Sequence, residues 1–286
     1  MAIAGTGTKA DPWIVHNYDE IKDVFQNRVT SDNLYAKLAN DINCNDYGDT
    51  WEWETIAVYA NWKFEFDLDG HTIKNIMIKS GNSLFYGKST VNVIRNGKIL
   101  NVFNNAGESV INGNGLMLKD ISMSVNGTGL TDCAFNQISM DNCAVYFKSN
   151  KLNNEVFLRA NITSPFKNTD FYLDISNVNS KKIFGGSSNY LTIDNCRISG
   201  KLRGALVSKY LSLGGARNSV IEVDTTLADC VSAQTIFSDV STGIINTEIS
   251  PNLTDGTSGL TACTTAQMRD ADYLNSIGFT VVKVGE

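Results

Sequence analysis

The chain has 286 residues, a formal net charge of −6 and a pI near 5.0. This acidic balance, without any run of Lys and Arg interleaved with aromatic residues, argues against a nucleic-acid-binding protein. No stretch approaches the roughly 18 consecutive apolar residues of a membrane-spanning helix, so we expect no membrane insertion. Charged residues make up 19% of the chain and only 3 prolines occur, a composition that suits hydrogen-bonded strands.

The N-terminal segment contains one predicted helix. Over residues 19–28, the apolar residues Ile21, Val24 and Phe25 recur at helical spacing, and a strand is predicted over residues 34–38. The end of a stacked β-protein presents unpaired strand edges and apolar core to solvent. We therefore expect this helix to cap such an end.

Further along the chain, asparagine recurs in one apolar frame. An apolar residue lies two positions before the asparagine, another lies one position after it, and a third lies three positions after it. The clearest copies centre on Asn75, Asn142 and Asn195. Weaker copies centre on Asn101, Asp120, Asn161, Asn177, Asn218 and Asn246. The mean spacing of these centres is roughly 21 residues, within the range of solenoid repeats.

The frame predicts a bend between two strands. Alternating apolar residues indicate β-strands, and the alternation breaks at the asparagine. Asparagine tolerates the left-handed backbone region better than other non-glycine residues, so the chain can turn there. A strand, a bend, a second strand and a return make one coil of a parallel β-helix. Stacked coils would then place Asn75, Asn142 and Asn195 at equivalent corners, with their amides bonded in a ladder.

We therefore predict an all-β, single-stranded, right-handed parallel β-helix (a solenoid) with short capping helices at both ends of one domain. Its parts are an N-terminal cap over residues 1–62, coils over residues 63–250, and a C-terminal cap over residues 251–286. The alternative is an asparagine-rich β-sandwich in which the spacing arises by chance. Between residues 150 and 180 the register stays open, because Asp174 competes with Asn177.

The cysteines and histidines predict no metal site and no cofactor. Cys143 and Cys196 follow the asparagine directly and are expected to point into the core as small apolar residues. The other cysteines are scattered, without the paired CxxC spacing of a zinc site. Only His16 and His71 occur, and no Ser-His-Asp arrangement accompanies them.

The C-terminal cap contains a second predicted helix. Thr265 can cap its N-terminus, and Gly278 suits the position just after its end. Its apolar side would carry Met268, Ala271, Tyr273, Leu274 and Ile277. A last strand is predicted over residues 279–284.

Two segments in the N-terminal quarter of the chain carry a family resemblance. Residues 5–12 read GTGTKADP before an apolar strand and the capping helix, and residues 69–75 read DGHTIKN. Both resemble motifs of right-handed parallel β-helix surface proteins of tailed bacteriophages, which bacterial β-helical adhesins share. The remainder of the chain resembles them in repeat style. The resemblance implies the fold and a structural turn role for His71.

From this resemblance we expect a non-enzymatic structural virion protein, exposed on the phage particle as a head fibre, a decoration protein or a tail appendage. The first residues lack a basic segment followed by a long apolar run, so no secretory signal is predicted. This favours assembly in the host cytoplasm and a place on the virion. The expected partners are other capsid or tail proteins and host cell-surface polysaccharide. A polysaccharide-degrading tailspike and a bacterial surface adhesin are the alternatives.

Asp67 and Asp69 are the weak candidates for catalysis. Glycoside hydrolysis needs two carboxylates roughly 5 to 9.5 Å apart in a groove. Alternation along one strand would place both side chains on the same face. We favour a non-catalytic interpretation, because the pair lies in the capping region rather than in the middle of the rod.

Four aromatic residues cluster just before the first full coil: Trp51, Trp53, Tyr59 and Trp62. They either pack the cap or a subunit interface, or they form a platform that binds sugar or a partner protein. The long exposed sides of a rod also predict a homo-oligomer, most simply a trimer. Either this cluster or the apolar C-terminal strand would join the subunits.

Overall fold

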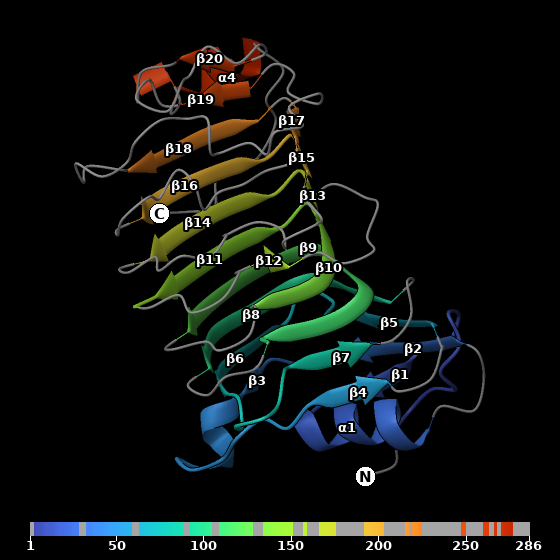
Figure 1. Ribbon diagram of the computed structural model, residues 1–286. Helices are drawn as coiled ribbons and strands as arrows, with labels where there is room; N and C mark the ends of the chain where they lie inside the picture. The colour runs from blue at the N-terminus through green and yellow to red at the C-terminus, as the bar shows by residue number, and fades with distance from the viewer. Residues whose placement is uncertain are drawn as a thin grey trace.

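The computed structural model shows a parallel β-helix, in which coils stack into a rod with α1 at its N-terminal end (Figure 1). This confirms the predicted fold. The structure describes residues 3–28, 33–58, 63–87, 92–104, 109–127, 134–150, 157–158, 166–175, 192–202, 215–217, 219–224, 247–249, 260–262, 266–267 and 270–276.

Three sheets run along the rod, and their strands pair in parallel. The first sheet contains β1 (Trp13–Val15), β2 (Asn33–Leu38), β5 (Lys63–Asp67), parts of β8 (Val93–Asn104), β9 (Ile111–Gly127) and β10 (Phe135–Asp141), then β13 (Phe166–Lys167), β15 (Thr192–Asp194) and β17 (Gly215–Arg217). The second contains β3 (Ile42–Asn43), β6 (Thr72–Met77), the later parts of β8 and β9, then β11 (Ala144–Ser149), β14 (Asp170–Ile175), β16 (Arg197–Leu202), β18 (Val220–Asp224), β19 (Thr247–Ile249) and β20 (Leu260–Ala262). The third contains β4 (Ile56–Val58), β7 (Phe85–Gly87), the first parts of β9 and β10, and β12 (Phe157–Leu158).

The parallel ladders are not limited to residues 63–250. Strands β1, β2 and β3 already pair with the coils above them, within the segment 1–62 that the sequence assigns to the cap. At the other end, β20 pairs with β19 beyond residue 250. Both capping segments therefore contribute strands to the stack.

Helix α1 (Tyr18–Asn27) covers the N-terminal end, as the helical spacing predicts. The Asn17 side chain caps it by accepting a hydrogen bond from the Glu20 backbone N–H at 2.9 Å. Its apolar face is buried, and the Phe25 ring packs edge-on against Phe64 and Phe66 inside the coil, with centroid distances of 5.2 and 5.4 Å. This packing removes the open end of the core from water.

The glycine-rich motif of residues 5–12 forms a tight loop against the first strands. Gly7 has a φ of +76°, and a Cβ atom at this position would lie 2.3 Å from the Trp13 indole nitrogen. Its carbonyl accepts a hydrogen bond from the Tyr35 N–H in β2 at 3.0 Å. Only glycine fits both the left-handed backbone and the close approach of the indole.

The core consists of inward side chains that stack in columns from coil to coil. One column of the second sheet contains Ile73, Ile99, Met123, Val145, Phe171 and Ile198, all buried. A column of the third sheet contains Phe85, Ile111, Phe135 and Phe157, with Phe135 and Phe157 stacked at 5.0 Å. A single coil cannot bury its own inner face, so stability rests on stacking.

The asparagine residues form ladders, but the prediction of equivalent corners is wrong for Asn75. Asn142 and Asn195 turn the chain from the first sheet into the second, with φ of 54° and 51°. Their amides donate to Asp120 at 2.6 Å and to Asn168 at 2.8 Å. Asn75 instead lies inside strand β6 of the second sheet.

Asn75 belongs to a separate ladder that spans β3, β6 and β8, the first three strands of the second sheet. Its amide donates to Asn43 at 2.8 Å, and the Asn101 amide donates to Asn75 at 3.0 Å. Two residues separate the inward Ile73 and Ile76, whereas a single residue separates the corresponding inward positions from β9 onward. Asn75 and Asn101 are therefore β-bulges with left-handed backbones, at φ of 59° and 53°.

The structure also settles the register of the coil between residues 150 and 180, which the sequence left open. The bend of that coil lies at Asn168, with φ of 48°, a residue that the repeat frame did not select. Asp174 lies within the straight strand β14. Asp120 has a left-handed backbone as expected, at φ of 54°. The expected centres at Asn161, Asn177, Asn218 and Asn246 lie outside the described residues.

Cys143 and Cys196 point into the core, as predicted, with exposed fractions of 5% and 0%. They belong to one column of small side chains, with Thr169 between them and Ser219 after Cys196. Burial raises the pKa of each thiol to about 12, so both stay protonated and unreactive at neutral pH.

A short helix, α4 (Ala271–Ser276), lies within the predicted C-terminal cap. Its N-terminus is capped by Asp270, whose carboxylate accepts hydrogen bonds from the backbone N–H groups of Asp272 and Tyr273 at 2.9 and 3.1 Å. The predicted cap at Thr265, the glycine at position 278 and the strand over residues 279–284 lie outside the described residues.

We predict that Asn75→Ala costs about 2–4 kcal/mol of unfolding free energy. The change removes two side-chain hydrogen bonds and forces alanine into the left-handed region. Asn75→Gly loses the same bonds without the backbone strain, so it should cost less. Urea unfolding measures both, with Asn126→Ala as a control at an exposed position. Equal costs for the two Asn75 variants would contradict the bulge assignment.

Candidate functional site

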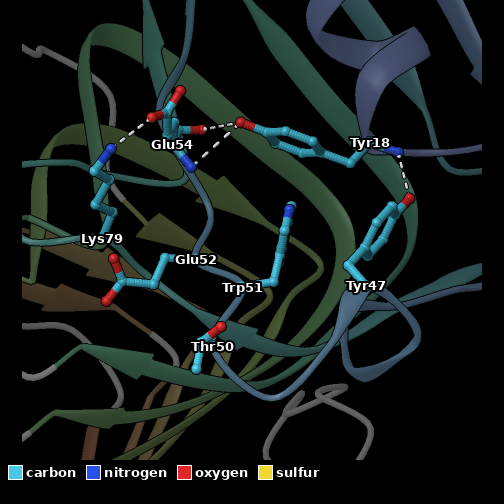
Figure 2. A pocket seen from close by; sticks show the side chains of 7 residues that line it. All are labelled: Tyr18, Tyr47, Thr50, Trp51, Glu52, Glu54 and Lys79. Carbon is cyan, nitrogen blue, oxygen red and sulfur yellow. Dashed lines mark hydrogen bonds and ion pairs between the residues drawn. The ribbon is translucent and has the colours of Figure 1, made fainter.

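A pocket of about 460 Å³ opens at the N-terminal end of the rod (Figure 2). Its lining residues come from helix α1, the 3-10 helix η1 (Cys44–Tyr47), the segment between η1 and β4, and Lys79, which lies two residues after β6. The lining residues are Tyr18, Tyr47, Thr50, Trp51, Glu52, Glu54 and Lys79.

Aromatic side chains form one wall of the pocket. The rings of Tyr47 and Trp51 stack, with centroids 4.7 Å apart and planes 22° apart. Tyr18 meets Trp51 edge-on at 4.8 Å. Figure 2 shows Trp51 with Tyr47 on one side and the acidic and basic residues of the pocket on the other. Trp51 is thus a pre-positioned ring whose far side faces the polar wall.

The tyrosine hydroxyls hold this wall in place. The Tyr47 hydroxyl accepts a hydrogen bond from the Tyr18 N–H at 2.9 Å. The Tyr18 hydroxyl donates to the Glu54 carbonyl at 3.1 Å and accepts from the Glu54 N–H at 3.2 Å. Burial raises the pKa of both tyrosines, so they remain neutral. The cap helix is therefore tied to the pocket segment through two rings.

Trp53 fixes the segment from the other side. Its side chain is fully buried, and its indole N–H donates to the Leu84 carbonyl at 3.0 Å. Its backbone accepts from Lys79 and donates to Met77 at 3.0 and 2.7 Å. The Trp51 ring packs edge-on against Trp53, with centroids 6.2 Å apart, so the buried Trp53 supports the ring that lines the pocket.

Charged side chains form the opposite wall. The Glu54 carboxylate pairs with Lys22 at 2.6 Å and with Lys79 at 2.7 Å. Hydrogen bonds from these two ammonium groups lower the pKa of Glu54 to about 2. Glu52 is exposed at the mouth. The wall therefore offers carboxylate acceptors and an ammonium donor to a ligand.

The predicted aromatic cluster is divided by the fold. Trp53 is a core residue and cannot contact a ligand, whereas Trp51 lines the pocket. Tyr59 and Trp62 lie outside the described residues. Tyr18, Tyr47 and Lys79 were missed, because they come from separate elements and no short motif contains them. The alternation Trp51-Glu52-Trp53-Glu54 was the one local signal.

Asp67 and Asp69 do not share one strand face, so that expectation is wrong. Asp67 ends β5 and pairs with Arg95 at 2.7 Å. Asp69 follows in a left-handed turn, with φ of 50°, and pairs with Lys37 at 2.9 Å. Neither residue lines the pocket. Both carboxylates serve ion pairs between coils.

The His71 ring nitrogen lies 3.3 Å from the Asp41 carboxylate, and the His71 carbonyl accepts from the Lys98 N–H at 3.0 Å. The residue thereby joins neighbouring coils at the turn that follows β5. Among the described residues, no group of three or more His, Cys, Asp and Glu side chains is arranged to hold a metal ion. In the same part of the chain, no helix has the length and apolar character needed to cross a membrane.

We predict that the Glu54 ion pairs make stability depend on acid pH. In the folded state the pKa of Glu54 is about 2, below its ordinary value of 4.5. The ion pairs therefore stabilise the fold fully above pH 4.5. Their contribution falls as pH drops from about 4.5 to about 2. Glu54→Gln should lower the Tm at neutral pH, and the difference should shrink in acid. Glu52→Gln is the matched control, and an equal Tm loss in both variants would contradict the assignment.

Comparisons with known proteins add information on the fold. No protein-family model matches the chain, and no curated protein sequence matches it. Among solved structures, the chain is similar to a putative immunoglobulin A1 protease from Bacteroides ovatus, with a TM-score of 0.52 and 14% sequence identity. The match covers 91% of this chain and 83% of that protein. At this identity, the likeness shows a shared fold alone.

Proposed function

We propose that the chain is a non-enzymatic structural protein on the surface of a phage virion, and that its cap pocket binds saccharide of the host cell surface. The observation that carries the binding role is the Trp51 ring facing Glu52 and Lys79 across the pocket. A head fibre, a decoration protein and a tail appendage are the forms that this role can take.

The chemistry of the two walls suits a sugar ring. A pyranose presents apolar C–H groups on its faces and hydroxyl groups around its edge. Trp51 offers a flat apolar surface, held by Tyr47 at 4.7 Å before any ligand arrives. Carboxylates accept and Lys79 donates hydrogen bonds at the ring edge. A preformed site of this kind loses little entropy when the ligand binds.

The virion role rests on the resemblance of residues 5–12 and 69–75 to phage β-helix proteins and on the architecture. A capped solenoid is a rigid spacer that can project a binding site from a particle. The proposed partners are capsid or tail proteins at one end and host polysaccharide at the pocket. A trimer remains the proposed assembly, although the burial of Trp53 removes that residue from any interface.

The tailspike alternative draws support from one observation, the presence of Glu52 and Glu54 in the same pocket. Hydrolysis needs one carboxyl that stays protonated as general acid, which requires a raised pKa. Glu54 has its pKa lowered to about 2 by Lys22 and Lys79, so it cannot serve as that acid. Glu52 is exposed to solvent. We therefore favour binding without cleavage.

The location is tested with antibodies against the purified chain. Gold-labelled antibodies should decorate intact phage particles released from an infected culture. Labelling of the bacterial envelope in uninfected cells, without labelled particles, would instead support the adhesin alternative. Absence from both places would overturn the surface role.

We predict that Trp51→Ala weakens saccharide binding by about tenfold or more, because the stacking surface is lost. Binding is measured on an array of host-derived and defined oligosaccharides, followed by titration calorimetry. Trp51→Phe should retain most of the affinity, and Tyr35→Ala, on the outer face of β2, should leave it unchanged. Oligosaccharide release by the purified protein, abolished by Glu52→Gln, would establish the tailspike alternative.

A further inference from the structure

Exposed aromatic side chains lie on the outer face of the second sheet. Phe103 in β8 is 36% exposed and Tyr146 in β11 is 37% exposed. The Tyr146 ring stacks on Tyr172 of β14, with centroids 5.2 Å apart and planes 6° apart. None of these three residues takes part in the pocket described above.

The strand register aligns these residues with the pocket. Met77, two residues before Lys79 of the pocket, is paired with Phe103, then with Asn126 and Lys148 in successive coils. In the neighbouring outward column, Ser124, Tyr146, Tyr172 and Ser199 follow one another. We call the two outward columns together, from Met77 to Tyr172, the aromatic track. From β6 to β14 there are four inter-strand steps, so this track is roughly 19 Å long.

The residues that flank the tyrosine pair in its column are both small. The next residue below Tyr146 is Ser124, and the next above Tyr172 is Ser199. Each serine is too small to cover the neighbouring ring, so a flat group can lie against either tyrosine. Ser124, Asn126 and Lys148 place hydroxyl, amide and ammonium groups beside these surfaces.

The alternation of aromatic and polar groups selects the class of ligand. A protein interface has a contiguous apolar core from which charged residues are depleted. Here Asn126 and Lys148 are exposed between Phe103 and Asp174 along one column. A chain of sugars repeats the same alternation, because each ring carries apolar faces and a hydroxylated edge.

We infer that the ligand is a linear polysaccharide that extends from the Trp51 pocket along the outer face of the second sheet to Tyr172. This inference rests on the proposed function of the pocket. Trp51, Phe103 and the Tyr146–Tyr172 pair each contact a different sugar of one chain. Affinity therefore grows with chain length, although each single contact is weak.

The test compares a disaccharide with a hexasaccharide of the same uncharged hexose repeat, using a β-1,4-linked glucose series and a β-1,4-linked N-acetylglucosamine series as probes. Calorimetry should give the wild-type protein at least a tenfold lower Kd for the hexasaccharide. The double variant Tyr146→Ala/Tyr172→Ala should lose this length-dependent gain while keeping its Kd for the disaccharide. Trp51→Ala should lose both the length-dependent gain and the affinity for the disaccharide.

Matched variants separate the outcomes. Tyr146→Phe/Tyr172→Phe keeps both rings and should retain the gain, and Tyr35→Ala controls for the loss of a tyrosine elsewhere. A Tm close to that of the wild type shows that the double alanine variant is folded, and if it is not, Phe103→Ala tests the same track. Equal Kd values for both chain lengths would overturn this inference while leaving the pocket intact. Failure of every probe to bind would overturn the pocket itself.

Discussion

The turn from the first sheet to the second depends, in the six coils from β5–β6 to β15–β16, on a residue with a left-handed backbone. Six such residues have φ between 48° and 60°: Asp69, Asn96, Asp120, Asn142, Asn168 and Asn195. All are Asp or Asn, whose short polar side chains tolerate this region best among non-glycine residues. The bend keeps apolar residues inward on both of its sides. A shift of one residue would turn the following strand inside out, so the core of the second sheet depends on this conformation.

Most of the fold could be predicted from the sequence, because the bend leaves a local signature. The register could not, and Asn75 explains why. Around Asn142, the inward Met140 and Cys143 flank two outward residues, and Ile73 and Ile76 flank two others in the same way. A corner and a bulge both need a left-handed residue just before an inward one. Local pattern alone cannot separate the two, since the difference lies in which strand of the next coil is paired.

The candidate site was less accessible to prediction. The sequence predicts part of its aromatic wall, because Trp51 and Trp53 alternate with glutamates. It does not show which of the two tryptophans is buried in the core. The remaining parts are distant in sequence, and Tyr18 and Lys79 meet at the pocket only because α1 folds over the end of the stack. Long-range packing of a cap has no periodic signal. The ion pairs of Glu54 have the same origin.

The hydrogen bonds between coils run along the axis of the rod, and this has a mechanical consequence. When the rod is pulled from its ends, the load opens these bonds one coil at a time instead of shearing whole strands at once. The coil from Asn168 to Asn195 spans 27 residues. Released and extended, it would reach roughly 90 Å, whereas folded it adds only about 4.8 Å to the rod. Under tension the molecule would therefore lengthen in large steps and absorb work before either end of the rod detaches from its attachment.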